Sequence, residues 1–191
     1  MRAGALPAPR IPVDFDGENQ MGITGTAYRI VLLLHILCAI IGFGAVLLNG
    51  IYGREAKKRP GPGGLAIAEA NYTVSSIAKY FIYAVFVLGL ALVGMSDKIW
   101  EFSQTWIWLA VILYIIGIGV SHGALFPSAR RMKALAAEMV AAGPPPADAP
   151  PGPPPQAAEM GQIEKKLGAA SAFLDVLLVV IIVLMIWKPG A

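Results

Sequence analysis

Two histidines, His35 and His122, and one aspartate, Asp175, are the ionisable side chains that lie within long apolar segments of the chain. His35 lies inside residues 30–53, which carry no fixed charge, and Asp175 is the single charge within residues 167–187. An ionisable side chain at the centre of a membrane helix costs ~2.5–3.5 kcal/mol on insertion scales and is usually retained with a partner. These positions are therefore candidate functional residues, and the elements that carry them decide what they can do.

Four apolar segments are long enough to cross a bilayer, whose hydrocarbon core of ~30 Å needs ~20 apolar residues in a helix. They are residues 30–53, 80–96, 102–129 and 167–187. With 57% hydrophobic and 14% charged residues, the chain is far more apolar than a soluble domain. The sequence predicts an all-α fold class: a polytopic membrane protein whose four-transmembrane-helix bundle contacts the lipid bilayer.

The distribution of Lys and Arg predicts the orientation. If the helices alternate, ten of the fifteen basic residues fall on one side of the membrane and five on the other. Basic loops stay in the cytoplasm, so we expect a multi-pass protein of the bacterial plasma (inner) membrane with both termini extracytoplasmic. Topology accounts for the basic loops, and nothing in them indicates a nucleic-acid partner.

Composition also divides the chain. Residues 1–26 are expected to be a disordered extracytoplasmic segment, with Met1 or Met21 as the start, and residues 27–135 hold the first three transmembrane helices and a basic cytoplasmic loop. Residues 136–165 are expected to be a flexible Pro-rich linker, because GPPPADAPPGPPP forms neither helix nor sheet. Residues 166–191 hold the fourth transmembrane helix and a short C-terminus.

Asn49, His122 and Asp175 are predicted to form a polar site inside the membrane on the cytoplasmic side. At ~1.5 Å per residue, His122 lies ~27 Å below the outer start of its helix, and Asp175 lies ~13 Å above the inner boundary. His122 and Asn49 are the groups expected to satisfy the carboxylate, with Ser121 and Tyr83 nearby. Alternatively, Asp175 only makes interhelical hydrogen bonds or is kept neutral by burial.

His35 lies in the outer leaflet, with Cys38 one turn below it and Met95 near the top of the second span. It is a neutral imidazole bonded to a backbone carbonyl or a neighbouring hydroxyl, a ligand of haem or a metal, or part of a proton or ion path. His, Cys and Met suit a soft metal such as Cu(I). The cofactor stays unassigned, with haem b and copper as the possibilities. His122 lies ~18 Å deeper than His35, so the two cannot ligate one haem iron within one chain.

Small residues mark the expected helix contacts, because membrane helices associate by close packing. His35, Cys38, Gly42, Ala45 and Asn49 share one helix face by their 3-4-3-4 spacing, and that face should point into the bundle. The third span contains Gly117-x-x-x-Ser121 and Gly119-x-x-x-Gly123. The latter pair predicts a contact with a second copy or another membrane partner.

Three stretches carry a family resemblance: LLLHILCAIIGFGAVLL in the first span, HGALFPSARR closing the third, and LDVLLVVIIVLMIWKPGA at the end. They resemble a family of small bacterial integral membrane proteins of unknown function (domain of unknown function 2269), over nearly all of residues 26–191. More loosely, Leu-His-Ile followed by Gly resembles the copper-resistance D-type membrane domain and the small membrane oxidases of protoporphyrinogen. The second resemblance implies that His35 is tied to haem or copper.

The sequence shows no nucleophile with an oriented base and no glycine-rich phosphate loop. We expect a non-enzymatic membrane protein, an accessory or small-solute/ion-handling component that uses Asn49, His122 and Asp175. The alternative is a haem- or copper-binding membrane redox protein with His35 as a ligand.

Overall fold

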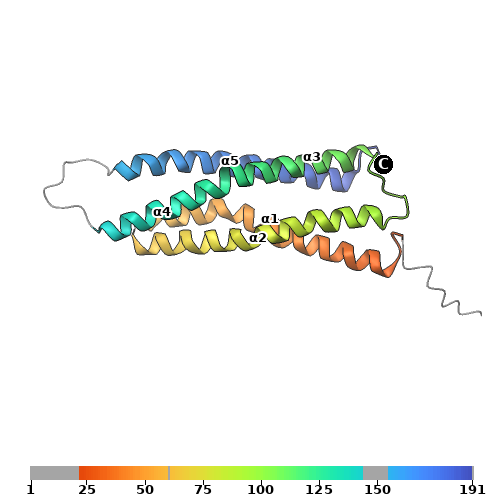
Figure 1. Cartoon of the computed structure of the whole chain (residues 1–191), viewed down its shortest axis with the longest axis horizontal. Coiled ribbons are helices and arrows are strands. Elements are labelled where there is room, and N and C mark those ends of the chain that lie inside the picture. Colours follow the sequence, from red (N-terminus) through yellow and green to blue (C-terminus); the bar gives the residue numbers. More distant parts are fainter. Residues whose placement is uncertain (1–21, 60, 144–154, 191) are drawn as a thin grey trace, which may run out of the picture.

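The computed structural model describes residues 22–59, 61–143 and 155–190, and all its regular elements there are helices (Figure 1). They are α1 (Thr26–Lys58), α2 (Pro62–Gly94), α3 (Thr105–Val120), the π-helical turn η2 (Ser121–Leu125), α4 (Phe126–Ala142) and α5 (Pro155–Trp187). Because α3, η2 and α4 follow without a break, they form one rod. Four rods within the described residues are long and apolar enough to cross a membrane, which confirms the predicted fold class.

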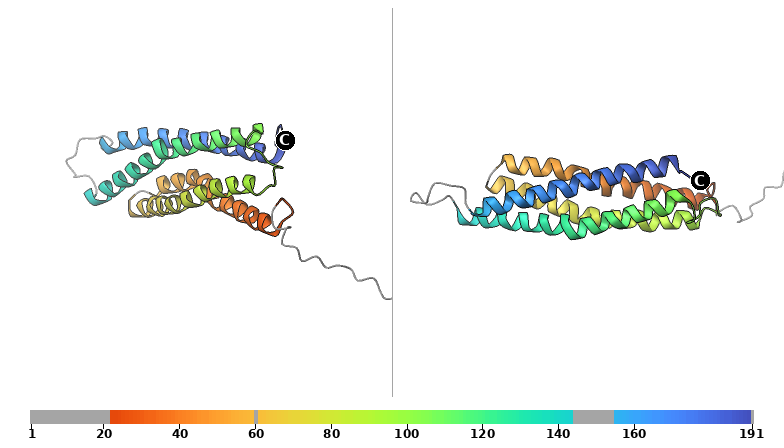
Figure 2. Two further views of the ribbon diagram at one scale, coloured as in Figure 1. Left: turned by 45° about the vertical axis from the view of Figure 1, so that its right-hand side comes forward. Right: turned by 90° about the horizontal axis from the view of Figure 1, so that it is seen from above.

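The rods run antiparallel along one axis. The start of α1, the connection from α2 to α3 and the end of α5 lie at one end of the molecule, and the α1–α2 turn lies at the other (Figure 1). Two layers are visible from the side, one made of α1 and α2 and the other of α3, α4 and α5 (Figure 2, left). The main contacts between the layers join α2 to α4 and α1 to α5.

Every rod is longer than a bilayer is thick. A helix of 33 residues such as α1 or α2 spans about 50 Å, against a hydrocarbon core of about 30 Å. The excess lies on the basic side in all four cases. We call this part the charged extension; it comprises residues 54–58, 62–79, 130–142 and 155–166.

The predicted domain boundaries need correction at two places. The expected linker of residues 136–165 is helical at both ends, because α4 runs to Ala142 and α5 begins at Pro155. Both ends are rich in Ala, Glu, Gln and Lys, which have high helix propensity. Hydropathy alone does not predict helices made of such polar residues. Residues 22–26 are also ordered, since the Gly22 N–H donates to the Met95 carbonyl at 3.0 Å. Residues 1–21 and 144–154, including both expected starts and most of the proline run, lie outside the described residues.

The predicted inner face of α1 is confirmed. Gly42 is buried, and His35, Cys38, Ala45 and Asn49 are half-buried, whereas the neighbouring leucines and isoleucines are exposed. Gly42 marks the closest approach of two helices. A Cβ there would lie 2.9 Å from Cγ1 of Ile82 and 3.1 Å from its backbone nitrogen.

The glycines of the third rod divide between two surfaces. A Cβ on Gly117 would lie 3.4 Å from a methyl group of Leu177, so this glycine faces α5. Gly119 and Gly123 have no atom within 4 Å of a built Cβ, so neither takes part in helix packing within the described residues. A partner at Gly119 and Gly123 stays a prediction.

Candidate functional site

His35 is held against α2 by a hydrogen bond to its backbone. Nδ1 lies 2.9 Å from the carbonyl oxygen of Val85, and because a carbonyl only accepts, Nδ1 carries the proton and donates it. A Cβ on Gly89 would lie 3.2 Å from Cε1 of the ring, so the glycine makes room for the imidazole. This is the backbone-carbonyl contact, the first of the three interpretations of His35.

Met95 does not meet His35. It caps the C-terminus of α2 six residues beyond Gly89, or about 9 Å further along the helix. Within residues 22–59, 61–143 and 155–190, no group of three or more His, Cys, Asp or Glu side chains could hold a metal ion. The pair predicted to bind a cofactor is therefore not assembled within the described chain.

Asn49 and His122 are bound at two separate levels of α2. The Ser75 hydroxyl donates to Oδ1 of Asn49 at 2.9 Å, and the Tyr83 hydroxyl lies 2.7 Å from Nε2 of His122. Ser75 and Tyr83 are eight residues apart, which is about 12 Å along a helix. Tyr83, expected near the inner site, is the partner of His122, whereas Asn49 belongs to a different contact.

Asp175 joins neither of these contacts. It lies on α5, and its Oδ1 is buried without a hydrogen-bond partner among the described residues. The expectation that Asn49 and His122 satisfy this carboxylate is not met by the geometry. The reason is rotational: α5 packs against both α1 and η2, but the Asn49 and His122 side chains both bond to α2.

The π-helical turn η2 sets the direction of His122. The Phe126 N–H donates to the Ser121 carbonyl, five residues back, which is the bond that defines a π turn. Pro127 follows and has no N–H, so the regular bond to Gly123 is missing and the wider turn costs little. In the neutral ring, Nδ1–H of His122 donates to the Ile118 carbonyl at 3.0 Å, and Nε2 accepts from Tyr83.

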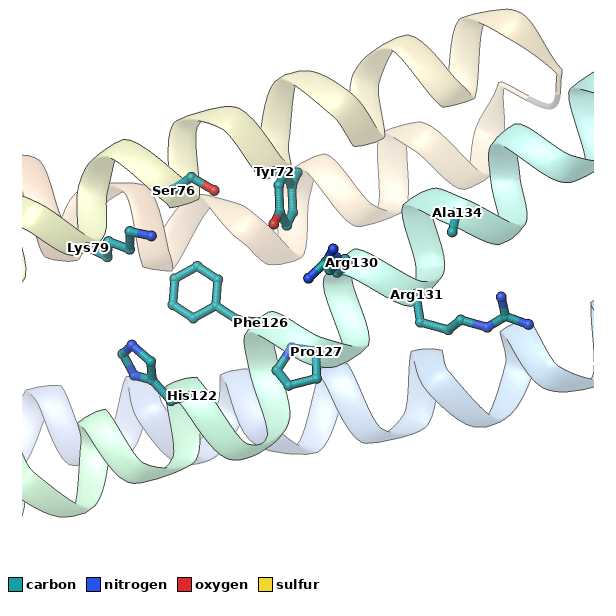
Figure 3. A pocket seen from close by; sticks show the side chains of 9 residues that line it. All are labelled: Tyr72, Ser76, Lys79, His122, Phe126, Pro127, Arg130, Arg131 and Ala134. Carbon is teal, nitrogen blue, oxygen red and sulfur yellow. The ribbon is translucent and has the colours of Figure 1, made fainter.

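Beside His122 lies an open pocket of about 530 Å³ between α2 and α4 (Figure 3). The lining residues are Tyr72, Ser76 and Lys79 from α2, His122 from η2, and Phe126, Pro127, Arg130, Arg131 and Ala134 from α4. Three of them are permanent cations and none is a carboxylate. We call this the basic pocket.

Arg131 is the one pocket cation that is already neutralised. Its guanidinium donates two bonds to Glu159 on α5, at 2.7 and 3.0 Å, and lies 3.3 Å from Glu138. Hydrogen bonding to Arg131 holds the pKa of the Glu159 carboxyl below its ordinary value. In Figure 3 the Arg131 side chain points away from α2.

Lys79 and Arg130 remain for a ligand. No carboxylate pairs with either of them in the described part of the chain. The Lys79 ammonium lies 5.0 Å from the ring centre of Tyr80 and 5.8 Å from that of Phe126, so aromatic faces stabilise it in place of an acidic partner. Such an arrangement can bind an anion without first breaking an ion pair.

Of the pocket, sequence reasoning found only His122. Lys79 and Arg130 entered only as two of the ten basic residues that predict the orientation. A usable signal exists: Lys79 comes directly before the apolar residues 80–96, and Arg130 comes directly after the apolar residues 102–129. The two segments belong to rods of opposite direction, so both charges border their segments on the same side of the membrane. Such charges come to the same depth, although their distance depends on which rods are neighbours.

Comparison with known proteins identifies the family. Residues 29–189 match the family described as "predicted integral membrane protein (DUF2269)". The chain belongs to this family, as its sequence suggested. No curated protein and no solved structure matches the chain, and no match supports the looser copper-resistance and oxidase resemblances.

Proposed function

We propose that this integral membrane protein is a non-enzymatic component that binds an anionic ligand in the basic pocket, on the cytoplasmic side of the membrane. The proposal keeps His122 from the predicted solute site and replaces Asn49 and Asp175 with Lys79 and Arg130. The observation that carries it is the pairing state of these cations: two of the three in the pocket have no carboxylate partner among the described residues.

Electrostatics near the membrane boundary favours this reading over a cation site. An unpaired ammonium and guanidinium facing one cavity repel each other, and an anion between them relieves that repulsion. Tyr72 and Ser76 add hydroxyl groups that donate to an oxyanion. Both ring nitrogens of His122 are occupied by hydrogen bonds, so the ring forms part of the pocket wall.

A pair of charge-matched double variants tests the proposal. Purified protein in neutral detergent is challenged with inorganic phosphate, glycerol phosphate and phosphatidylglycerol, and the thermal midpoint is recorded. Lys79→Gln with Arg130→Gln should abolish the stabilisation produced by whichever anion binds. Lys165→Gln with Lys166→Gln removes two charges from the same side of the protein, outside the pocket, and should preserve it. If no anion distinguishes the two double variants, the proposal fails.

A second candidate function is haem or copper binding through His35. The supporting observation is the ring's orientation: Nδ1–H is held by the Val85 carbonyl, and Nε2 has no hydrogen-bond partner among the described residues. A hydrogen bond from one ring nitrogen to a backbone carbonyl fixes the orientation of the ring and leaves the other nitrogen available to bind a metal. The second ligand would come from another copy, because Met95 lies elsewhere. Protein purified from cells supplied with haem and copper decides this: a colourless, metal-free sample rejects it.

A further inference from the structure

The basic pocket lies at the boundary between the apolar and the charged parts of the rods. Residues 80–94 of α2 and 105–129 of the third rod carry no Lys, Arg, Asp or Glu. The nearest charges on the basic side are Lys79, directly before residue 80, and Arg130, directly after residue 129, and both line the pocket. This is the depth at which the phosphates of a lipid leaflet lie, about one headgroup layer beyond the hydrocarbon core.

Aromatic and charged groups alternate along the pocket. Toward the membrane it is lined by Phe126 and the His122 ring, whose centres lie 5.5 Å apart, and by the Lys79 ammonium, 5.8 Å from the Phe126 ring centre. Toward the charged extension it offers the Tyr72 hydroxyl and the Arg130 guanidinium (Figure 3). Lys79 and Arg130 therefore belong to opposite ends of the pocket, and an anionic group between them has the Phe126 ring on its membrane side.

Apolar surface continues from the pocket into the membrane-embedded part. On α2 the Tyr80 side chain is 63% exposed and Val87 is 64% exposed, and on α3 Ile115 is 59% exposed. A soluble anion would make no use of this surface. The acyl chains of a lipid whose phosphate lay between Lys79 and Arg130 would lie directly on it.

We propose that the ligand of the basic pocket is an anionic membrane phospholipid, with its phosphate between Lys79 and Arg130 and its acyl chains along α2 and α3. This inference rests on the proposed function and narrows it, since a free phosphate has the same charge chemistry. Arginine binds phosphate through two parallel N–H groups, and lysine adds a point charge. Basic pockets between transmembrane helices on the cytoplasmic side have the chemistry that anionic headgroups require.

The test compares three additives on delipidated full-length protein in neutral detergent: dioleoyl phosphatidylglycerol, dioleoyl phosphatidylcholine and glycerol phosphate. Native mass spectrometry counts bound lipid, and thermal midpoints report stabilisation. Phosphatidylglycerol alone should bind tightly. Replacing one cation by Gln should weaken it about fivefold, and replacing both roughly twenty-five-fold. The Lys165→Gln and Lys166→Gln double variant is the control.

Each outcome has a separate meaning. If glycerol phosphate binds through Lys79 and Arg130 as well as the lipid does, the anion site stands and the lipid inference is wrong. Equal binding of phosphatidylcholine also overturns it, because the headgroup charge then does not matter. If no additive depends on the two cations, the lipid inference and the proposed function fail together. Should the Lys79 variant not fold, Arg130→Gln alone decides, since Arg130 is exposed.

Discussion

Within the apolar segments the rods are joined by hydrogen bonds and close backbone approach, whereas in the charged extension ion pairs and buried apolar side chains such as Leu135 also join them. The embedded contacts include His35 to the Val85 carbonyl, and Tyr114 to the Ile82 carbonyl at 3.0 Å. In the charged extension, Lys57 of α1 lies 2.8 Å from Glu164 of α5, and Arg131 joins α4 to α5. The same four rods therefore pass from lipid, in the apolar segments, into water, in the charged extension.

The two regions differ in the interactions that stabilise the contacts between helices. In lipid there is no hydrophobic drive between helices, so packing and polar contacts decide the arrangement. In water the same rods bury apolar surface, and Leu135 of α4, with 1% of its surface exposed, is the most buried apolar side chain of the described residues. The basic pocket lies where these two regimes meet.

The largest expected effect is all-or-none: the two ends of the third rod should be labelled from opposite sides of the membrane. Single cysteines at Ser103 and at Ala141, in a Cys38→Ala background, lie at opposite ends of the third rod. An impermeant maleimide added to intact cells should label the first and should reach the second only after permeabilisation. Labelling of both from outside would show that the rod does not cross the membrane.

Next in size is the close approach of α1 and α2 inside the membrane. Gly42→Leu forces a side chain into the backbone of Ile82 and should destabilise the protein by about 1–3 kcal/mol. Gly44→Leu is the matched control, because a Cβ there has nothing within 4 Å. Thermal midpoints in detergent measure both. Equal midpoints for the two variants would contradict the α1–α2 contact.

A smaller effect is expected at His35. His35→Leu removes the donor to the Val85 carbonyl and should cost about 0.6–1.7 kcal/mol, the range for interhelical hydrogen bonds in membranes. His35→Gln keeps a donor and should lose less. Unfolding in mixed micelles with sodium dodecyl sulfate gives both values. A variant pair that instead loses a bound chromophore equally would favour the haem or copper alternative.

The smallest effect is expected in the charged extension. Glu159→Gln removes one of the two carboxylate partners of Arg131, the other being Glu138. The Arg131–Glu159 pair is exposed and screened by salt, so the effect should disappear at high ionic strength. Because Arg131 lowers the folded-state pKa of Glu159, the pair stabilises the protein above the ordinary carboxyl value of 4.5 and the stabilisation is lost as pH falls below it. Thermal midpoints from pH 7 to pH 3, at low and at 1 M salt, measure this. An effect that persists in 1 M salt would contradict a purely electrostatic contact.

The sequence by itself determined the four rods, their alternation and the inner face of α1. Each depends on local composition or spacing: long apolar runs have no alternative to helix in lipid, since each backbone polar group must be satisfied within its own segment. The 3-4-3-4 spacing likewise predicts that His35 points into the bundle, whereas its contact with α2 comes from the structure. The continuation of the helices beyond the apolar segments was not predicted in full, because hydropathy identifies residues that lie in the bilayer and not helical residues in water.

Only the tertiary structure decided which side chains meet. Asn49, His122 and Asp175 are all predicted on the cytoplasmic side of the membrane, yet Asn49 reaches Ser75 and His122 reaches Tyr83. Oδ1 of Asp175 has no partner among the described residues, although α5 packs against both α1 and η2. Depth follows from counting residues at a fixed rise, but partners depend on how each rod is rotated and which rod is its neighbour. Those are set by contacts between distant segments: Gly42 against Ile82, and the π turn before Pro127, which turns His122 and Arg130 toward Lys79.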